Sequence, residues 1–305
     1  MGEPYAERAL LVYRGDIIMP AVDIDGIATH YEISGSGPPI LMMAPGGFDS
    51  AIEKWSTSWP WQHFLPLTAF ASTYTCVAYD RREAGHSGGR VERLTWAAYA
   101  DQAKGLLHHL GIASAFVMGS CLGCSPVIAF AARYPQACRG LVLAQPSGGA
   151  KRRLTAHRHF NAHGQYVQEN GLEAVVELAR AKGSFPQVPE SGPWAAVLAH
   201  DTRFAEQFVQ QDVDRYLALV AVSCHSLFDR DTIPGAEPEE LLALKLPALI
   251  LPGHTDAHAT SCARYLEECI PGSEYWDVHL ESQPPDLIRD RILAFLAAHA
   301  GAGVR

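Results

Sequence analysis

The chain has 305 residues, 48% of them hydrophobic, and its 24 basic and 33 acidic residues give a formal net charge of -9. This hydrophobic content is sufficient for a sizeable core and excludes intrinsic disorder as the main state. The acidic balance argues against sequence-independent nucleic-acid binding, which needs clustered lysines and arginines. The densest basic run, Lys151 to Arg153, is too short for that purpose and is interpreted as a solvated turn.

No stretch of the sequence resembles a targeting or membrane segment. The longest apolar run near the N-terminus, Ala9 to Tyr13, is shorter than the hydrophobic part of a secretory signal. A transmembrane helix needs roughly 18 uncharged apolar residues, and the chain has no such run. Its seven cysteines are odd in number and scattered, which predicts reduced thiols rather than a disulfide framework. We therefore expect a cytoplasmic protein with no membrane or nucleic-acid partner, and the sequence leaves its oligomeric state open, a homodimer included.

The predicted elements begin with two antiparallel strands, 17–22 and 27–34, joined by a turn at Asp25 and Gly26. Short, continuous apolar runs follow, which are typical of strands that are buried on both faces of a parallel sheet. These runs are 39–43, 74–79, 115–118, 140–144 and 248–251, with a plausible last strand at 274–278.

Helical periodicity lies between these runs, which predicts βαβ units. One helix is expected from a cap at Thr95 to Leu110, a second over 122–134, and a last helix at the C-terminus. Between about 149 and 241 only helical patterns occur, and this segment is interpreted as an inserted helical cap. The expected organisation is a core formed by residues 1–148 and 242–305, with a cap formed by residues 149–241.

The sharpest motif is Gly119-Ser120-Cys121-Leu122-Gly123, placed between a predicted strand and a predicted helix. It resembles the nucleophile elbow G-x-S-x-G of the α/β-hydrolase family, with cysteine in place of serine. The resemblance implies an α/β fold, namely a mostly parallel sheet flanked by helices, with Cys121 as nucleophile. The amino end of the following helix would favour a thiolate. The alternative interpretation is that Cys121 is an inert small residue in a tight turn.

Two further stretches extend the resemblance to that family. Met43-Ala44-Pro45-Gly46-Gly47-Phe48 resembles its oxyanion loop, which implies that the backbone N–H groups of Gly47 and Leu122 stabilise a developing oxyanion. Pro45 stands where the family often has histidine. The segment from Asp80 to Gly88 resembles a structural turn of the same family, enlarged by one residue, and we expect no catalytic role for it.

The resemblance also implies an acid and a histidine after the last strands. Asp256 follows the predicted strand 248–251 at the family's position for the acid, and His279 follows the predicted last strand at its position for the base. His258, two residues beyond Asp256, is the alternative base. We favour His279 because neighbours on one loop tend to point apart, so that one of them would not reach the thiol. An exposed loop histidine remains the alternative interpretation for both.

Other cysteines and histidines raise separate hypotheses. Cys121 and Cys124 form a C-x-x-C at a helix start, as in thiol redox proteins, although Cys124 also fits as a packing residue. Cys262 and Cys269 are too widely spaced for a zinc pair, so no metal is expected, and no cofactor either. The histidines that begin the predicted cap suggest substrate contacts or simply a polar segment: His157, His159 and His163.

Together these features predict a hydrolase with a Cys121, His279, Asp256 triad, which acts on an ester, lactone or thioester of a small molecule through an acyl-cysteine. Cysteine elbows resembling this one occur in dienelactone hydrolases and polyhydroxyalkanoate synthases. The alternatives are a carbon–carbon bond hydrolase or an acyltransferase of the same fold, a ligand-binding protein without activity, and a thiol redox protein. The sequence does not identify the substrate.

Overall fold

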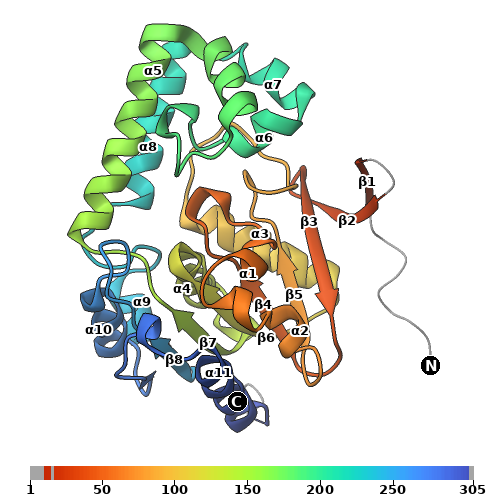
Figure 1. Ribbon diagram of the computed structural model, residues 1–305, viewed down its shortest axis with the longest axis vertical. Helices are drawn as coiled ribbons and strands as arrows, with labels where there is room; N and C mark the ends of the chain where they lie inside the picture. Colours follow the sequence, from red (N-terminus) through yellow and green to blue (C-terminus); the bar gives the residue numbers. More distant parts are fainter. Residues whose placement is uncertain (1–9, 15–16, 302–305) are drawn as a thin grey trace.

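The computed structural model describes residues 10–14 and 17–301, so the expectation of no export signal falls in part on residues outside the described ones, up to residue 9. Within them, nine strands form one sheet in the order β1-β2-β3-β5-β4-β6-β7-β8-β9 (Figure 1). The strands are β1 Leu10–Arg14, β2 Ile17–Ile24, β3 Ile27–Ser34, β4 Pro39–Met43, β5 Thr75–Tyr79, β6 Ala115–Ser120, β7 Cys138–Ala144, β8 Ala248–Leu251 and β9 Glu274–Tyr275.

The direction of the strands follows the sequence prediction. The first strands, β1 to β3, are antiparallel, β3 is antiparallel to β5, and every pair from β5 to β9 is parallel. Asp25 and Gly26 both have positive φ at the predicted turn between β2 and β3. Strand β1 is an addition to the prediction, since its short apolar run pairs with β2. The α/β-hydrolase-type sheet expected from the sequence is confirmed.

Helices cover both faces of the parallel part of the sheet. The α-helices are α1 Lys54–Thr57, α2 Pro66–Ala69, α3 Trp96–His109, α4 Cys124–Arg133, α5 Ala150–Lys182, α6 Ala195–His200, α7 Thr202–Phe208, α8 Val213–Leu227, α9 Pro238–Leu242, α10 Thr260–Cys269 and α11 Pro285–His299. Short 3-10 turns are η1 Gly47–Asp49, η2 Trp61–His63, η3 Cys121–Gly123, η4 Pro135–Ala137, η5 Pro189–Ser191 and η6 Leu280–Ser282. As predicted, Thr95 caps α3, where its hydroxyl accepts a hydrogen bond from the Ala98 N–H.

The apolar runs of the parallel strands are explained by burial on two sides. Along β4, Leu41 and Met43 join one apolar cluster, while Ile40 and Met42 join a second. Successive side chains of a strand point to opposite faces, so both faces of β4 are core. The first cluster contains α3, α4 and α10, and the second contains α11 with Trp55 and Trp61.

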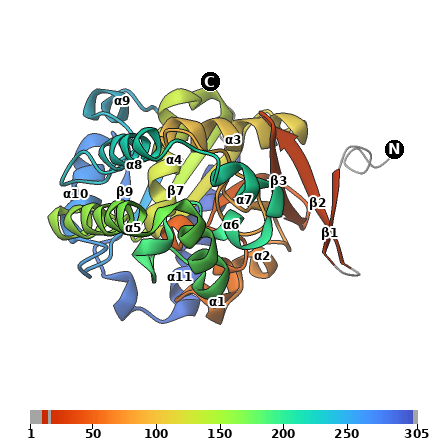
Figure 2. The ribbon, with the colours of Figure 1, turned by 90° about the horizontal axis from the view of Figure 1, so that it is seen from above.

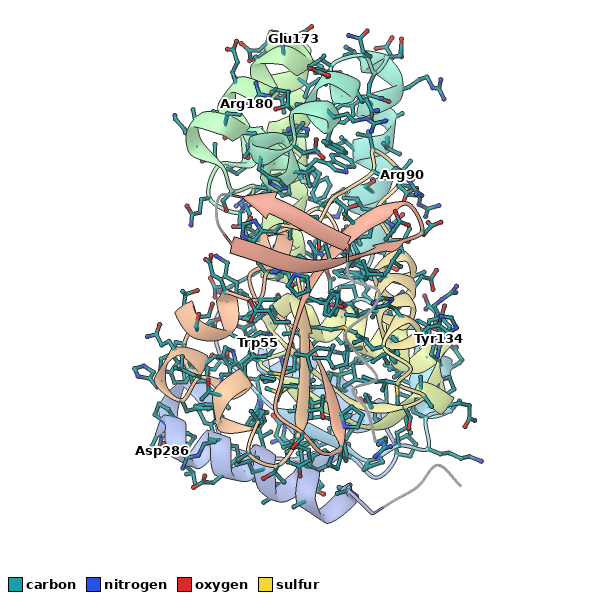
Figure 3. All side chains as sticks on the ribbon, turned by 90° about the vertical axis from the view of Figure 1, so that its right-hand side faces the viewer. Trp55, Arg90, Tyr134, Glu173, Arg180 and Asp286 are labelled. Atoms are coloured by element: carbon teal, nitrogen blue, oxygen red, sulfur yellow. The ribbon has the colours of Figure 1, made fainter. Side chains whose placement is uncertain are left out.

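A helical insertion, α5 to α8, separates β7 from β8 in the sequence although these strands are neighbours in the sheet. It rises from the sheet at one end of the molecule, where the long helices α5 and α8 run side by side (Figures 1 and 2). Helical backbone in α5 is interrupted at Gly171, which has φ 81°. Trp194 of the insertion donates from Nε1 to the carbonyl oxygen of Arg90 at 2.9 Å, and Arg90 lies where the insertion meets the rest of the chain (Figure 3).

The parallel strands point their carboxyl ends to one edge of the sheet. The segments that leave β4, β6, β7 and β8 at this edge contain Gly47, Cys121, Ser147 and His258 respectively. Ligands of open α/β sheets bind at such carboxyl ends. Among the described residues, no helix is long and apolar enough to cross a membrane.

Candidate active site

Cys121 lies at a sharp turn between β6 and α4. Its φ is 55°, in the left-handed region that residues with a side chain seldom adopt, and its side chain is only partly buried. Such a conformation costs about 1–3 kcal/mol and persists only where the surroundings enforce it. The turn thus exposes the thiol at the carboxyl edge of the sheet.

The two glycines that flank this turn are required by close backbone contacts. A Cβ on Gly119 would lie 2.5 Å from the carbonyl oxygen of Gly123, and a Cβ on Gly123 would lie 2.4 Å from that of Met43. Real Cβ atoms essentially never approach a backbone oxygen so closely. The G-x-C-x-G pattern is therefore explained by the packing of the elbow against the end of β4.

The imidazole that faces the Cys121 thiol belongs to His258, on the loop after β8. Nε2 of His258 is buried without a nitrogen or oxygen partner. Burial alone would raise the pKa of Cys121, but its hydrogen bond and charge interaction with His258, the Leu122 N–H and the charge of Arg152 lower that pKa to about 7. Burial would lower the pKa of His258, and Cys121 and then Glu281 raise it. The pair therefore favours a thiolate beside an imidazolium near neutral pH.

The other ring nitrogen of His258 is held by Thr255. Nδ1 of His258 lies 2.9 Å from Thr255 Oγ1, and the His258 N–H donates to the Thr255 carbonyl oxygen at 3.1 Å. A parallel bridge between Gly148 and His258 anchors the same loop to the segment after β7. Thr255 therefore fixes the orientation of the ring that presents Nε2 to the thiol.

Glu281, in η6, is the carboxylate whose charge acts on His258. Its Oε1 is buried without a partner, and its Oε2 lies 3.0 Å from Nδ1 of His254. Gly253 lies between the two groups, because a Cβ there would be 2.6 Å from the His258 Cβ and 3.0 Å from Glu281 Oε1. Burial would raise the pKa of Glu281, but hydrogen bonds from its own backbone N–H, His254 and Gln145 lower it, so the carboxylate is charged at neutral pH.

The structure does not bring Asp256 and His279 to the thiol. Asp256 is 80% exposed and forms an ion pair with Lys151 at 2.6 Å. His279 is exposed and stacks on His254, with ring centroids 4.6 Å apart. The sequence analysis favoured His279 over His258 as the base, but in the structure the ring that faces the thiol is His258. The physical reason is that the bridge to Gly148 turns His258 inward, while Asp256 remains at the surface.

Gly47 and Leu122, the two residues predicted to form an oxyanion hole, lie beside each other at the elbow. The Leu122 N–H interacts with the Cys121 sulfur, and the elbow packs against the loop after β4. A Cβ on Gly47 would lie 3.8 Å from Leu122 Cδ2, which places Gly47 beside the elbow. Gly46 and Gly47 adopt φ of 107° and 64°, values that glycine reaches more easily than other residues. Pro45, which precedes them, is compatible with this conformation of the loop.

Cys124 is a packing residue in this structure. Its side chain is fully buried, and its Sγ donates to the carbonyl oxygens of Gly119 and Ala144 at 3.3 and 3.4 Å. Burial, and then the charge of Cys121, raise its pKa well above the ordinary value, which opposes thiolate formation. A buried thiol with a raised pKa is a poor partner for thiol–disulfide exchange, so this environment does not favour a C-x-x-C redox site. The described residues contain no cluster suited to a metal ion.

The turn from Asp80 to Gly88 is held together by its own hydrogen bonds. Asp80 Oδ1 accepts from the Ile52 N–H at 2.7 Å, and Oδ2 lies 2.9 Å from Nδ1 of His30. The Ser87 hydroxyl donates to the Asp80 carbonyl oxygen at 2.6 Å. These contacts fit a structural rather than a catalytic segment.

A hollow of about 220 Å³ adjoins the site beneath the insertion. A Cβ on Gly47 would lie 3.9 Å from Pro186, one of its lining residues, and Ala257 in its wall precedes His258. The lining residues are Phe48, Arg152, Thr155, Ala156, His159, Phe160, Phe185, Pro186, Asp256 and Ala257.

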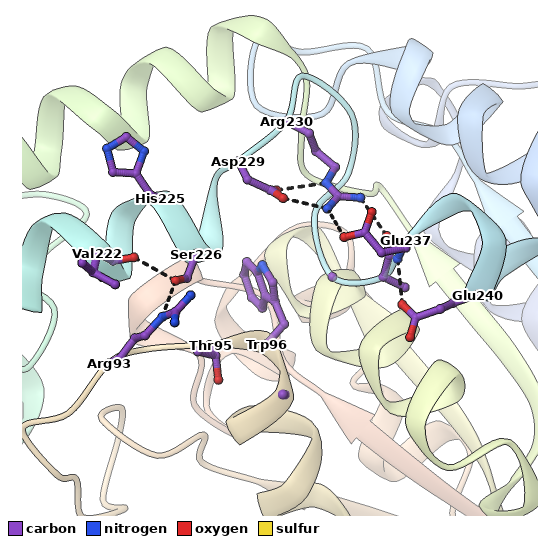
Figure 4. Close-up of a pocket in the computed structure, with 13 residues that line it drawn as sticks. Arg93, Thr95, Trp96, Val222, His225, Ser226, Asp229, Arg230, Glu237 and Glu240 are labelled. Atoms are coloured by element: carbon purple, nitrogen blue, oxygen red, sulfur yellow. Dashed lines mark hydrogen bonds and ion pairs between the residues drawn. The ribbon is translucent and has the colours of Figure 1, made fainter.

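A larger hollow of about 460 Å³ lies between the insertion and α3, away from these groups (Figure 4). Its charges are paired with one another: Arg230 binds Asp229 and Glu237, both at 2.7 Å, and Arg93 donates to Ser226 at 2.6 Å. No residue of the Cys121 site lines it. Its size therefore does not make it the reaction centre.

The three histidines at the start of the insertion have different environments. His163 is completely buried and lies 2.6 Å from the Tyr216 hydroxyl and 2.8 Å from the Glu190 carbonyl oxygen. Burial lowers its pKa to about 4, so it is neutral and structural. His157 contacts the Phe228 carbonyl oxygen, whereas His159 lines the 220 Å³ hollow.

The functional residues that the sequence analysis missed are Thr255, Glu281 and Arg152. Thr255 precedes His258 by three residues, a spacing that carries no recognised signal. Glu281 lies two residues after His279, on the loop expected to supply the histidine. Arg152 was interpreted as part of a solvated turn, but it lies in the first turn of α5 and lines the hollow beside the site.

Comparison with known proteins agrees with the fold. A family model described as alpha/beta hydrolase fold matches residues 39–175. An uncharacterized hydrolase, YraK of Bacillus subtilis, is 30% identical over 129 residues, which are 41% of this chain and 43% of that protein. RutD of Azorhizobium caulinodans, named as a candidate carbamate hydrolase, is 25% identical over 274 residues, which are 87% of this chain and 94% of RutD.

The solved structure of the enol-lactonase from Burkholderia xenovorans superimposes with a TM-score of 0.59 at 22% identity, covering 91% of this chain and 100% of the other. At this identity the likeness concerns the fold alone. The parallel sheet, the elbow at its carboxyl edge and the matching family model agree with one another. The chain has the α/β-hydrolase fold.

Proposed function

We propose that this protein is a hydrolase that cleaves an ester, lactone or thioester of a small molecule through a covalent acyl intermediate on Cys121. The observation that carries the proposal is the thiol of Cys121, held at positive φ beside His258 with its pKa lowered to about 7. A thiolate is the reactive form of cysteine, and this pKa leaves a large fraction of it at neutral pH. The hydrolase names of YraK and RutD support the reaction class.

In the proposed reaction, the Cys121 thiolate attacks the carbonyl carbon, a C–S bond forms, and the carbonyl electron pair moves to oxygen. The N–H groups of Leu122 and Gly47 stabilise that oxyanion. The intermediate collapses, the C–O or C–S bond to the leaving group breaks, and the His258 imidazolium donates its proton to the departing atom. His258 then takes a proton from water, which attacks the acyl-cysteine and releases the carboxylic acid and the thiolate.

His258 takes the role of base, and Thr255 and Glu281 orient and charge-stabilise it. This assignment rests on the 2.9 Å contact of Thr255 with Nδ1 and on the effect of Glu281 on the pKa of His258. The insertion, residues 149–241, serves as the substrate cap in this proposal, because its residues line the hollow beside the thiol. Thiolate is a better leaving group than alkoxide, so activated substrates such as thioesters and enol lactones should be preferred over alkyl esters.

The test is intact-protein mass after brief exposure to p-nitrophenyl acetate. We expect an acetyl adduct that maps to Cys121, disappears in Cys121→Ala, and forms at the wild-type rate in Cys124→Ala, the buried neighbour that the mechanism does not use. A wild-type protein that forms no adduct and releases no p-nitrophenol from any activated ester would overturn the proposal. An adduct that persists in Cys121→Ala would move the nucleophile elsewhere.

A further inference from the structure

Arg152 is a partly buried cation without a carboxylate partner within the described residues, 10–14 and 17–301. It belongs to the first turn of α5, and its Nε donates to the Ser147 hydroxyl at 3.3 Å. Its guanidinium lies 5.1 Å from the centre of the Phe228 ring, within the range of a cation–π contact. Burial lowers its pKa, a sign that water is partly excluded from the charge.

The other charged groups of the 220 Å³ hollow do not neutralise Arg152. Asp256 is engaged by Lys151 at 2.6 Å at the exposed rim. Burial, and then the charge of Arg152, lower the pKa of His159, so this imidazole is neutral at pH 7. The rest of the wall is largely apolar, with Phe48, Phe160 and Phe185. Among the described residues that line the hollow, Arg152 is therefore a cation without a carboxylate partner, in an aromatic surrounding.

This charge lies within electrostatic reach of the reaction centre. Arg152 acts on Cys121 and Cys121 acts on Arg152. Phe48 follows Gly47, one of the proposed oxyanion donors, and Ala257 precedes His258. A substrate whose carbonyl lies on Cys121 would therefore extend its remaining atoms toward the guanidinium.

We propose that Arg152 binds a carboxylate on the acyl part of the substrate, so that the enzyme acts on esters, lactones or thioesters of dicarboxylic acids. A planar guanidinium with free N–H groups matches a carboxylate in geometry, and charge-assisted hydrogen bonds in a site that excludes water are strong. An arginine in such a site without a counter-ion is costly, and a bound anion removes that cost. This inference rests on the proposed acyl-cysteine mechanism and adds the substrate class to it.

The experiment compares two esters of equal chain length, p-nitrophenyl glutarate monoester and p-nitrophenyl valerate. We expect wild-type kcat/KM to be higher for the glutarate ester by about tenfold or more, as for one hydrogen bond to a charged group. In Arg152→Met this preference should disappear, and in Arg152→Lys part of it should remain. Arg153→Met is the matched control, because it removes a neighbouring cation that pairs with Asp231 and does not line the hollow, and it should leave the preference unchanged.

The ratio of kcat/KM for the two esters separates substrate binding from any effect of Arg152 on the thiol, because a loss of thiolate lowers both values equally. Equal wild-type rates for the two esters, or an unchanged ratio in Arg152→Met, would overturn the inference while leaving the acyl-cysteine mechanism intact. Absence of turnover and adduct with both esters would instead overturn the proposed function. If Arg152→Met fails to fold, the wild-type ratio and that of Arg152→Lys decide.

Discussion

The elbow around Cys121 and the two loops that face it are built in different ways. The elbow is enclosed by backbone: its flanking glycines touch the carbonyl oxygens of Gly123 and Met43, and its residues follow a strand that is fully buried. The loops after β8 and β9 are held by polar side chains that are partly exposed, such as Thr255, His254 and Glu281.

This difference explains where the sequence pattern is informative. Backbone contacts at the elbow permit only glycine at two positions, so the turn can be recognised from its residue types. Hydrogen bonds between loop side chains can be made by several residues at several positions. A histidine or carboxylate of the site can therefore be supplied by a different loop while the order of strands and helices stays the same.

The largest expected effect concerns the choice between the two loop histidines. His258→Ala should lower kcat/KM for an activated ester by about 10²- to 10⁴-fold, because it removes the group that shares a proton with the thiol. His279→Ala removes an exposed ring that stacks on His254 and should leave kcat/KM within about twofold. Steady-state kinetics of both variants is the measurement.

A large loss in His279→Ala together with normal activity in His258→Ala would reverse this assignment and restore the order that the sequence suggested. Thermal unfolding of each variant would show whether a loss of activity merely reflects a loss of fold.

A second comparison tests whether close contacts, rather than backbone conformation, exclude a side chain from the glycine positions of the elbow. Gly123→Ala should lower the free energy of unfolding by about 3 kcal/mol or more, because its methyl group would overlap the Met43 carbonyl oxygen. Gly272→Ala is the control: Gly272 has φ 72° and open space around it, so it should cost only about 1–2 kcal/mol. Urea unfolding measures both.

Similar stability of the two alanine variants would mean that the elbow relaxes easily, and the steric account of the motif would then fail. If Gly123→Ala yields no folded protein while Gly272→Ala folds normally, that contrast supports the steric account.

Prediction from the sequence succeeded for the packed strands and helices and was less successful for the loops. The order and direction of the parallel strands were predictable, because runs such as Pro39–Met43 are apolar at every position and are buried on both faces. The start of α3 was predictable from the capping hydroxyl of Thr95. In the loops, the sequence offers three histidines, His254, His258 and His279, and only the bridge between Gly148 and His258 decides which ring turns inward.

Arg152 shows a further reason why sequence alone was insufficient. Its neighbours Lys151 and Arg153 pair with exposed carboxylates at the surface, which fits the interpretation of a solvated basic turn. On a helix, however, successive residues point about 100° apart, so one member of a basic run can face the interior. Its partly buried position became visible only once α5 was placed over the sheet.

The smallest expected effects come from the groups behind His258. Thr255→Val and Glu281→Gln should each lower kcat/KM by about tenfold, because one loosens the ring and the other removes the charge that raises the pKa of His258. Thr255→Ser should restore most of the loss, since it keeps the hydroxyl. His254→Gln is the control for Glu281→Gln, because it alters the other partner of that carboxylate without contacting His258.

The pH dependence of Cys121 alkylation by iodoacetamide separates orientation from charge. In the wild type the rate should rise with pH and reach half its maximum near pH 7, where the thiol ionises. Glu281→Gln weakens the imidazolium that stabilises the thiolate, so its midpoint should move to higher pH, by about one unit or less. Thr255→Val should change the midpoint less than the turnover, because it affects mainly the direction of the ring. A midpoint near the ordinary cysteine pKa in the wild type would mean that His258 does not act on the thiol, and the loops would then contribute structure rather than chemistry.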